Sequence, residues 1–237
     1  MTHCTSASTR GTPTSFDIFF EGWLVRQEHY LDELLSAQQH LGESREEYLE
    51  DLISRVLSHY QQYYEEKSRM SQINIFLVFS PPWFTSLERA FLWVAGFKPA
   101  LVFKLVSVFV TDLSEDQKQR MSRLIEGTKV EERALDDKLA KIQESVAAPA
   151  LLEKARERGR RLGTEETMRE EEEAAFNTLR SSMESVVRSA DLLRTETILN
   201  VVAILIPAQR VKLLAAAMQL HIKVRTRGLQ IDAEKHE

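Results

Sequence analysis

The chain has 237 residues, of which 43% are hydrophobic and 28% are charged, so it can bury a substantial core and is not a disordered chain. Its formal net charge of −5 excludes a general electrostatic attraction to nucleic acid, and its single cysteine excludes an internal disulfide. With only 8 glycines and 6 prolines, the composition also disfavours a turn-rich β protein.

Helical periodicity begins directly after a polar N-terminal segment. Residues 1–14 are rich in Ser, Thr and Gly, and we expect them to form a disordered tail. The next residues carry apolar side chains with a 3.6-residue period, which predicts a helix: Phe16, Phe19, Phe20, Trp23, Leu24, Tyr30, Leu31, Leu34 and Leu35. Residues 44–47 have the spacing of a capping box and predict the start of a second helix. Residues 73–79 are mostly apolar, and we favour a helix or extended chain there, because an isolated strand would lack a partner.

The block from residue 81 to residue 105 contains two of the three tryptophans and three of the six prolines. Its two leading prolines predict an extended entry, and residues 85–88 (Thr-Ser-Leu-Glu) predict a capped helix start. Gly96 suits the end of that helix, and Pro99 suits the first turn of the next one. The block therefore predicts a helical hairpin that presents tryptophans and a phenylalanine to a core or a partner.

The second half of the chain also reads as helical. Residues 114–117 predict the cap of a long helix that runs towards residue 147. A helix is expected from about residue 164, and Pro207 starts a last helix that ends near Gly228. We therefore predict an all-α fold, a single domain of long antiparallel helices over residues 15–228, followed by a C-terminal tail at 229–237.

Two charged clusters invite functional interpretations that we do not favour. The arginines between Arg156 and Arg161 could bind phosphates or direct nuclear import, but their acidic neighbours favour an exposed linker. The acidic run from Glu170 to Glu173 could bind a cation, but consecutive helical carboxylates point in different directions, which favours a solvated face.

Four stretches resemble, in the same order, the plant Delay-of-Germination domain, which also forms the C-terminal half of TGA-type bZIP transcription factors. Residues 93–99 (WVAGFKP) resemble its W-x-G-G-[WFC]-[RK]-P signature, with Ala95 in place of the first glycine. Residues 16–35 resemble its first helix, residues 112–117 (DLSEDQ) its D-L-S-x-x-Q helix start, and residues 193–220 its closing helix pair. The resemblance covers nearly the whole chain.

The resemblance implies a non-enzymatic plant regulatory protein that acts through protein contacts in seed dormancy, abscisic-acid signalling or developmental transcription control. It implies clade A protein phosphatases and transcription factors as partners, and a homodimer is plausible. The family's phosphatase-docking run is matched only at Trp23, so the chain is similar to the Delay-of-Germination-like paralogues. A pollen-aperture factor of the same family and a DNA-associated transcription cofactor are alternatives. Since no basic helix or leucine zipper precedes the first helix, we expect no autonomous DNA binding.

A haem- or small-ligand-binding sensor is a further alternative that the family suggests. Some dormancy members bind haem through two histidines four residues apart on the last helix. Here His221 matches the first of them, and Arg225 replaces the second. Because a guanidinium does not ligate iron, we expect no haem and no other cofactor.

Catalytic motifs are absent from the sequence, which has no phosphate loop, no zincin or nucleophile-elbow motif and no clustered metal ligands, so we expect no enzyme. Docking would then rely on aromatic anchors, and six candidate partner-binding residues follow: Phe19, Phe20, Trp23, Trp83, Trp93 and Phe97. For the tryptophans, a place in the core is the favoured alternative. No apolar signal core or membrane-length apolar run occurs, so we expect the nucleus and/or the cytoplasm and no membrane.

Overall fold

The computed structural model describes residues 15–42, 45–146 and 165–234, and this part of the chain is helical with a single isolated β-bridge. The predicted all-α domain is thereby confirmed. The helices are α1 (Ser15–Gln39), α2 (Glu46–Ile73), α3 (Ile75–Phe79), α4 (Ser86–Ala90), α5 (Leu101–Phe109), α6 (Glu115–Val146), α8 (Glu165–Ile204) and α9 (Pro207–Glu234). The predicted N-terminal tail and the arginine cluster lie outside the described residues.

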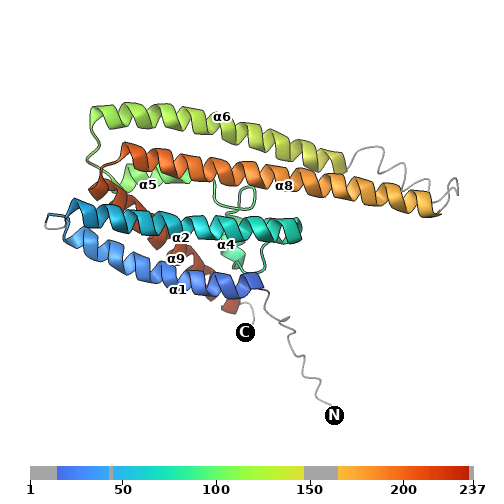
Figure 1. Cartoon of the computed structure of the whole chain (residues 1–237), viewed down its shortest axis with the longest axis horizontal. Coiled ribbons are helices and arrows are strands. Elements are labelled where there is room, and N and C mark those ends of the chain that lie inside the picture. Colours follow the sequence, from blue (N-terminus) through green and yellow to red (C-terminus); the bar gives the residue numbers. More distant parts are fainter. Residues whose placement is uncertain (1–14, 43–44, 147–164, 235–237) are drawn as a thin grey trace, which may run out of the picture.

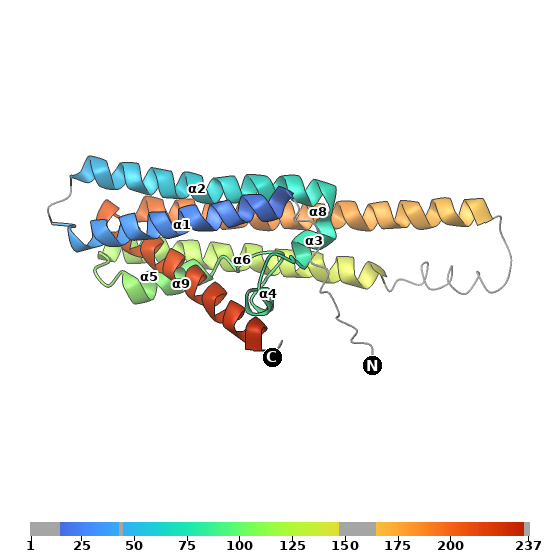
Figure 2. The ribbon, with the colours of Figure 1, turned by 90° about the horizontal axis from the view of Figure 1, so that it is seen from below.

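In the described part of the chain, the long helices form two antiparallel pairs and one crossing helix, and the short helices α3, α4 and α5 lie between them (Figure 1). α6 packs along α8, and α1 packs along α2. α9 runs obliquely to the other long helices, as Figure 2 shows, and contacts α1, α2, α4 and α5. None of the described helices combines the length and the apolarity that a bilayer span requires.

Several helix boundaries lie where local sequence signals place them. The backbone N–H of Gln117 donates to Ser114 Oγ at 3.2 Å, while Ser114 N–H donates to Gln117 Oε1 at 3.0 Å, which is the predicted reciprocal cap of α6. Residues 75–79 form a short helix capped by Asn74, whose Oδ1 accepts from Phe76 N–H at 3.0 Å. Pro207 begins α9, as predicted.

The last helix continues beyond its predicted end at Gly228. α9 reaches Glu234, so residues 229–234, which the sequence assigns to a tail, are helical. Gly228 is buried against Thr85, and a Cβ at this position would collide with the Thr85 hydroxyl. The glycine therefore permits a close crossing of α9 and α4 and does not end the helix.

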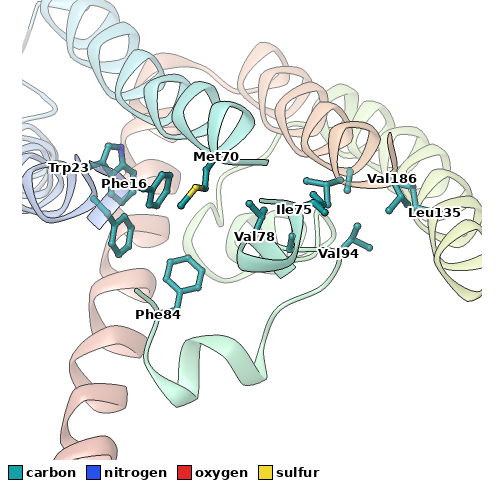
Figure 3. Close-up of a cluster of buried hydrophobic side chains, with 13 residues drawn as sticks. Phe16, Trp23, Met70, Ile75, Val78, Phe84, Val94, Leu135 and Val186 are labelled. Carbon is teal, nitrogen blue, oxygen red and sulfur yellow. The ribbon is translucent and has the colours of Figure 1, made fainter. Parts of the chain in front are cut away.

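The core is richest in aromatic rings where α1 meets α2 and the segment before α4. Figure 3 shows Phe16 and Trp23 of α1 beside Met70 of α2 and Phe84. The cluster continues through α3 to Val186 of α8 and Leu135 of α6, and so joins the two helix pairs. Burial of this apolar surface provides most of the folding free energy of such a domain.

One polar side chain in this core has no compensating hydrogen bond. The His59 ring stacks on the Trp23 indole, with ring centroids 4.4 Å apart and planes 7° from parallel. It is 1% exposed, and neither of its ring nitrogens bonds to the described part of the chain. Burial, assisted by the charges of Arg26 and His221, lowers the pKa of His59 to about 4.

Acidification should therefore destabilise the fold through His59. Between pH 6.5 and 4 the unfolded chain binds a proton at this histidine that the folded chain does not bind, so stability falls as pH falls. The loss between pH 7 and pH 4 is on the order of 3 kcal/mol. Urea unfolding of the His59→Leu variant at pH 7, 5.5 and 4 should show that its free energy of unfolding depends less on pH than that of the wild type. The exposed control His40→Leu should keep the slope of the wild type, and equal slopes in all three proteins would contradict the assignment.

Candidate functional site around α4 and the Trp93 turn

The segment between α3 and α5 begins with the predicted capping box. Thr85 Oγ1 accepts from Glu88 N–H at 3.2 Å, and Glu88 Oε2 accepts from Thr85 N–H at 2.7 Å. The helix that follows is short, because α4 ends at Ala90 and does not continue to Gly96. The predicted helical hairpin is thus wrong in its first arm, which is a single helical turn followed by a tight turn of different geometry.

This second turn, the Trp93 turn (residues 93–97), reverses the chain within two residues. Trp93 N–H donates to Gly96 O at 2.6 Å, and Gly96 N–H donates to Trp93 O at 3.1 Å. Val94 and Ala95 between them have φ values of 44° and 60°. Both lie in the left-handed region, which costs a residue with a Cβ about 1–2 kcal/mol. The surrounding structure must therefore hold the turn in place.

Arg194 of α8 supplies that restraint. Its guanidinium donates to three carbonyl oxygens of the turn: to Phe97 O at 2.7 Å, to Val94 O at 2.9 Å and to Trp93 O. These carbonyls point at the arginine and cannot accept bonds from a continuing helix. Gly96 leaves the space for this contact, since a Cβ there would lie 2.7 Å from the Arg194 Cζ atom.

A second cation and one carboxylate complete the buried charge group behind the turn. Asp191 Oδ1 accepts from Arg194 at 2.6 Å and from Lys67 Nζ at 2.7 Å. Lys67 is 2% exposed and Arg194 is 6% exposed. Burial lowers the pKa of Lys67 to about 8, although the Asp191 carboxylate opposes this shift. The group links α2, α8 and the Trp93 turn.

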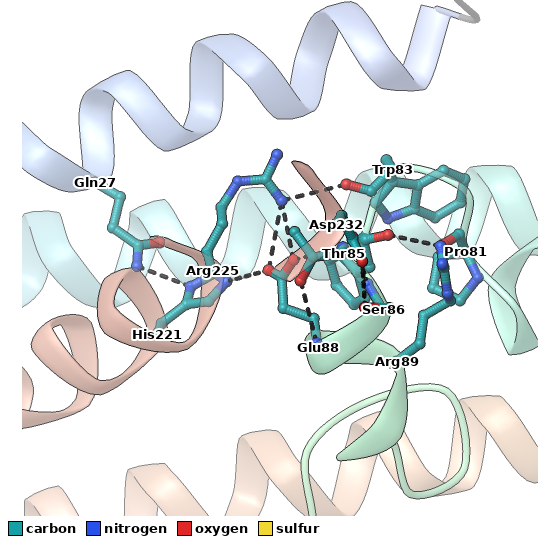
Figure 4. A network of polar contacts seen from close by, with 11 residues as sticks. Gln27, Pro81, Trp83, Thr85, Ser86, Glu88, Arg89, His221, Arg225 and Asp232 are labelled. Atoms are coloured by element: carbon teal, nitrogen blue, oxygen red, sulfur yellow. Dashed lines mark hydrogen bonds and ion pairs between the residues drawn. The ribbon is translucent and has the colours of Figure 1, made fainter. Parts of the chain in front are cut away.

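A separate polar network fastens α4 to α9 (Figure 4). Glu88 is fully buried, and its carboxylate lies 3.1 Å from Arg225 Nη1 and 3.6 Å from His221 Nε2. Burial by itself would raise the pKa of Glu88, but the nearby His221 ring, the hydrogen bonds with Thr85 and the Arg225 charge outweigh it and lower the pKa. Asp232 adds a bond to the Ser86 backbone N–H at 2.9 Å.

His221 and Arg225 do not fit the two-histidine haem site that the family suggests. The Gln27 side-chain amide nitrogen lies 2.9 Å from His221 Nδ1, and His221 Nε2 faces the Glu88 carboxylate at 3.6 Å. Arg225 occupies the second position and pairs with the same carboxylate. Across residues 15–42, 45–146 and 165–234, no three His, Cys, Asp or Glu side chains gather in a way that could hold a metal ion.

The six predicted aromatic residues divide into two groups. Phe20 and Trp23 are each 2% exposed, and in this conformation they offer no surface to a partner. The other four are partly buried: Phe19, Trp83, Trp93 and Phe97. Trp83 packs against Phe16 with ring centroids 4.2 Å apart and planes tilted by 38°.

Trp93 stands at the surface in a fixed orientation. Its indole Nε1–H donates to Asp136 Oδ1 at 2.6 Å, and Lys98 Nζ lies 5.4 Å from the ring centroid. Phe91, which follows α4, is 58% exposed. We call these four residues, Phe91, Trp93, Lys98 and Asp136, the Trp93 surface.

A pocket of about 850 Å³ lies on the other side of the turn. Its walls come from α2, α8, α9 and residues 96–105, and most of its lining is apolar. Tyr60, Tyr63 and Tyr64 of α2 line it together with Phe97 and His221. The sequence did not predict this pocket, because its walls come from segments far apart in the chain.

Comparison with known proteins gives consistent matches. A family model for seed dormancy control (DOG1) matches residues 30–107, which include α2, α4 and the Trp93 turn. Protein RESPONSE TO ABA AND SALT 1 of Arabidopsis thaliana is 39% identical over 219 residues, covering 90% of this chain and 94% of that protein. Protein DOG1-like 4 of the same plant is 32% identical over 213 residues, covering 89% and 90% respectively. Transcription factor TGA2.3 of Oryza sativa subsp. japonica is 31% identical over 134 residues, covering 56% of this chain and 40% of that factor.

Replacing Ala95 by glycine should stabilise the protein. The change relieves the left-handed strain, which outweighs the extra backbone entropy of glycine in the unfolded chain, so we expect a gain of about 0.5–1 kcal/mol. Chemical denaturation measures it. As a control of opposite sign, Ala134→Gly on the exposed face in the interior of α6 should cost about 1 kcal/mol. If Ala95→Gly destabilises the protein as much as the control does, the interpretation that Ala95 is strained is wrong.

The Glu88–Arg225 pair should show strong energetic coupling. Glu88→Gln leaves Arg225 without its carboxylate, and we expect a loss of about 3 kcal/mol in the free energy of unfolding. The double variant Glu88→Gln/Arg225→Met should lose at least about 1 kcal/mol less than the sum of the single changes. Arg227→Met, on the exposed side of the same helix, is the control and should be additive with Glu88→Gln. If the effects of Glu88→Gln and Arg225→Met on the free energy of unfolding simply add, the two side chains are not coupled.

Proposed function

Because the chain belongs to the seed dormancy control (DOG1) family, we propose that it is a plant regulatory protein that acts through protein contacts and not through catalysis. The names of its relatives support a role in responses to abscisic acid and salt or in seed dormancy. The proposed site of action is the nucleus, the cytoplasm or both, since the family includes transcription factors.

The observation that carries this proposal is that the buried charged side chains already have bonding partners. The buried charges Lys67, Asp191, Arg194 and Glu88 are bonded to one another, to the backbone or to α9. A catalytic acid or base needs an open path to a reacting atom, which such saturated groups do not offer. Their arrangement instead fixes a turn and an aromatic side chain at the surface.

The Trp93 surface has the properties of a docking anchor. Trp93 is held by the turn backbone, by Asp136 and by two cations over its ring, since Arg194 Cζ lies 5.3 Å from the ring centroid. A pre-oriented aromatic ring loses little side-chain entropy on binding, and such residues carry much of the binding energy in protein interfaces. Phe91 adds exposed apolar area beside it.

Three partners are proposed for this surface: a clade A protein phosphatase, a TGA-type transcription factor and a second copy of this chain. The first two follow from the family, and the likeness to TGA2.3 supports the second. Of the six predicted anchors, Trp93 carries the proposal, with Phe19, Trp83 and Phe97 as secondary candidates.

Binding of purified partners tests the proposal. Interferometry with an immobilised phosphatase or TGA-type factor, and sedimentation for the homodimer, should detect saturable binding of the wild-type chain to at least one of them. Phe91→Ala and Trp93→Phe should each weaken that binding by tenfold or more, because they remove or shrink the anchor. Thermal unfolding should show that both variants are folded.

The matched control is Phe109→Ala, which removes another exposed aromatic side chain at the end of α5. This variant should bind as the wild type does. The proposed surface is wrong if Phe109→Ala weakens binding as much as Phe91→Ala, or if none of the three partners binds.

A further inference from the structure

The pocket behind the Trp93 turn is shaped for an elongated molecule. α2 lines it from Glu50 to Ser68, which corresponds to about 27 Å of helix. Its volume of about 850 Å³ lies within the range of small-molecule sites. Leu57, Ile198 and Leu214 give it apolar walls from three helices.

Three phenol groups in the lining have no bonding partner in the described part of the chain. The hydroxyls of Tyr60, Tyr63 and Tyr64 take part in no hydrogen bond there, and they are not among the fully occluded unpaired atoms. Burial raises the pKa of all three tyrosines, to about 12 for Tyr64, so they remain neutral donors at physiological pH. An oxygen acceptor on a ligand would satisfy them.

The charged residues of the lining already have partners. Glu50 accepts from Arg210 at 2.8 Å, and Lys98 lies 3.6 Å from Asp136. Arg194 is occupied by Asp191 and the turn carbonyls, and Glu65 accepts from Gln61 at 2.9 Å. An anionic ligand would therefore find no free cation in the described lining, and its own desolvation would go uncompensated.

We infer that this pocket is a binding site for a neutral, elongated, apolar molecule with carbonyl or hydroxyl oxygens that accept hydrogen bonds from the tyrosine hydroxyls. The pocket shares Lys98 with the Trp93 surface, but Phe91, Trp93 and Asp136 do not line the pocket. The inference therefore stands whether or not the proposed partners bind.

Fluorescence titration of the purified full chain tests the ligand class. Nile red, a neutral dye with a carbonyl oxygen, should bind saturably at one site with blue-shifted emission. Anilinonaphthalene sulfonate, an anionic dye of similar size, should bind at least tenfold more weakly, and neither palmitate nor haemin should displace Nile red. Failure of Nile red to saturate overturns the inference, as does equal or tighter binding of any of the three anionic molecules.

Variants that fill the pocket locate the site. Ser58→Trp from α2 and Leu199→Trp from α8 place an indole into it from opposite walls, and each should weaken Nile red binding by tenfold or more. Both positions are exposed, so the larger side chain is compatible with folding. Gln62→Trp, exposed on α2 but outside the lining, is the control and should bind normally. Unchanged binding by both filling variants would place the dye elsewhere.

Removal of one hydroxyl tests the hydrogen bonding. Tyr64→Phe should weaken Nile red binding about two- to tenfold, which corresponds to one neutral hydrogen bond. The companion change Tyr60→Phe covers the case in which the dye carbonyl faces the neighbouring hydroxyl. Tyr48→Phe, on an exposed tyrosine outside the pocket, should have no effect. If neither Tyr64→Phe nor Tyr60→Phe weakens Nile red binding, the inferred recognition by tyrosine hydroxyls is wrong.

Discussion

The position of the Trp93 turn depends on the guanidinium of Arg194. Two residues in left-handed conformation make this turn unfavourable by itself, and the arginine offsets that cost with bonds to three carbonyl oxygens. Asp191 holds the arginine and also pairs with Lys67, so the group contains two cations and one carboxylate. Buried ion groups seldom add stability over apolar packing, which means that the value of this one lies in the geometry it imposes.

Glu88 plays the corresponding part on the other side of the same segment. Its carboxylate completes the cap of α4 and also lies 3.1 Å from Arg225 and 3.6 Å from His221, both on α9. The short helix α4 is therefore held by a helix that follows it by more than a hundred residues. Gly228 allows the two helices to approach closely at Thr85. Together with Arg194, this contact fixes both ends of the chain between α3 and α5, which explains how a segment with little regular structure can carry an oriented tryptophan.

Local signals in the sequence predicted most of the fold, and the distant contacts explain what they missed. The cap at Ser114 and the break at Pro207 involve neighbouring residues only, and both were predicted. The cap at residues 85–88 and Gly96 predict a helix across residues 93–95, whereas the geometry of the Trp93 turn comes from Arg194, about a hundred residues later. The sequence does indicate that Lys67 is unusual. This lysine follows Tyr60 and Tyr64 on one helical face and so lies where an apolar residue is expected.

The candidate site was predictable in composition but not in accessibility. Aromatic residues at helical spacing can face a core or a partner, and only packing decides between them, as Phe20 and Trp23 in the core and Phe91 at the surface show. The turn separates two partly buried aromatic neighbours, with Trp93 bonded to Asp136 of α6 and Phe97 lining the pocket. Since Arg194 bonds to the backbone carbonyls of both residues, it fixes the backbone from which the two side chains project. A scaffold of this kind suits recognition, where fixed geometry lowers the entropic cost of binding.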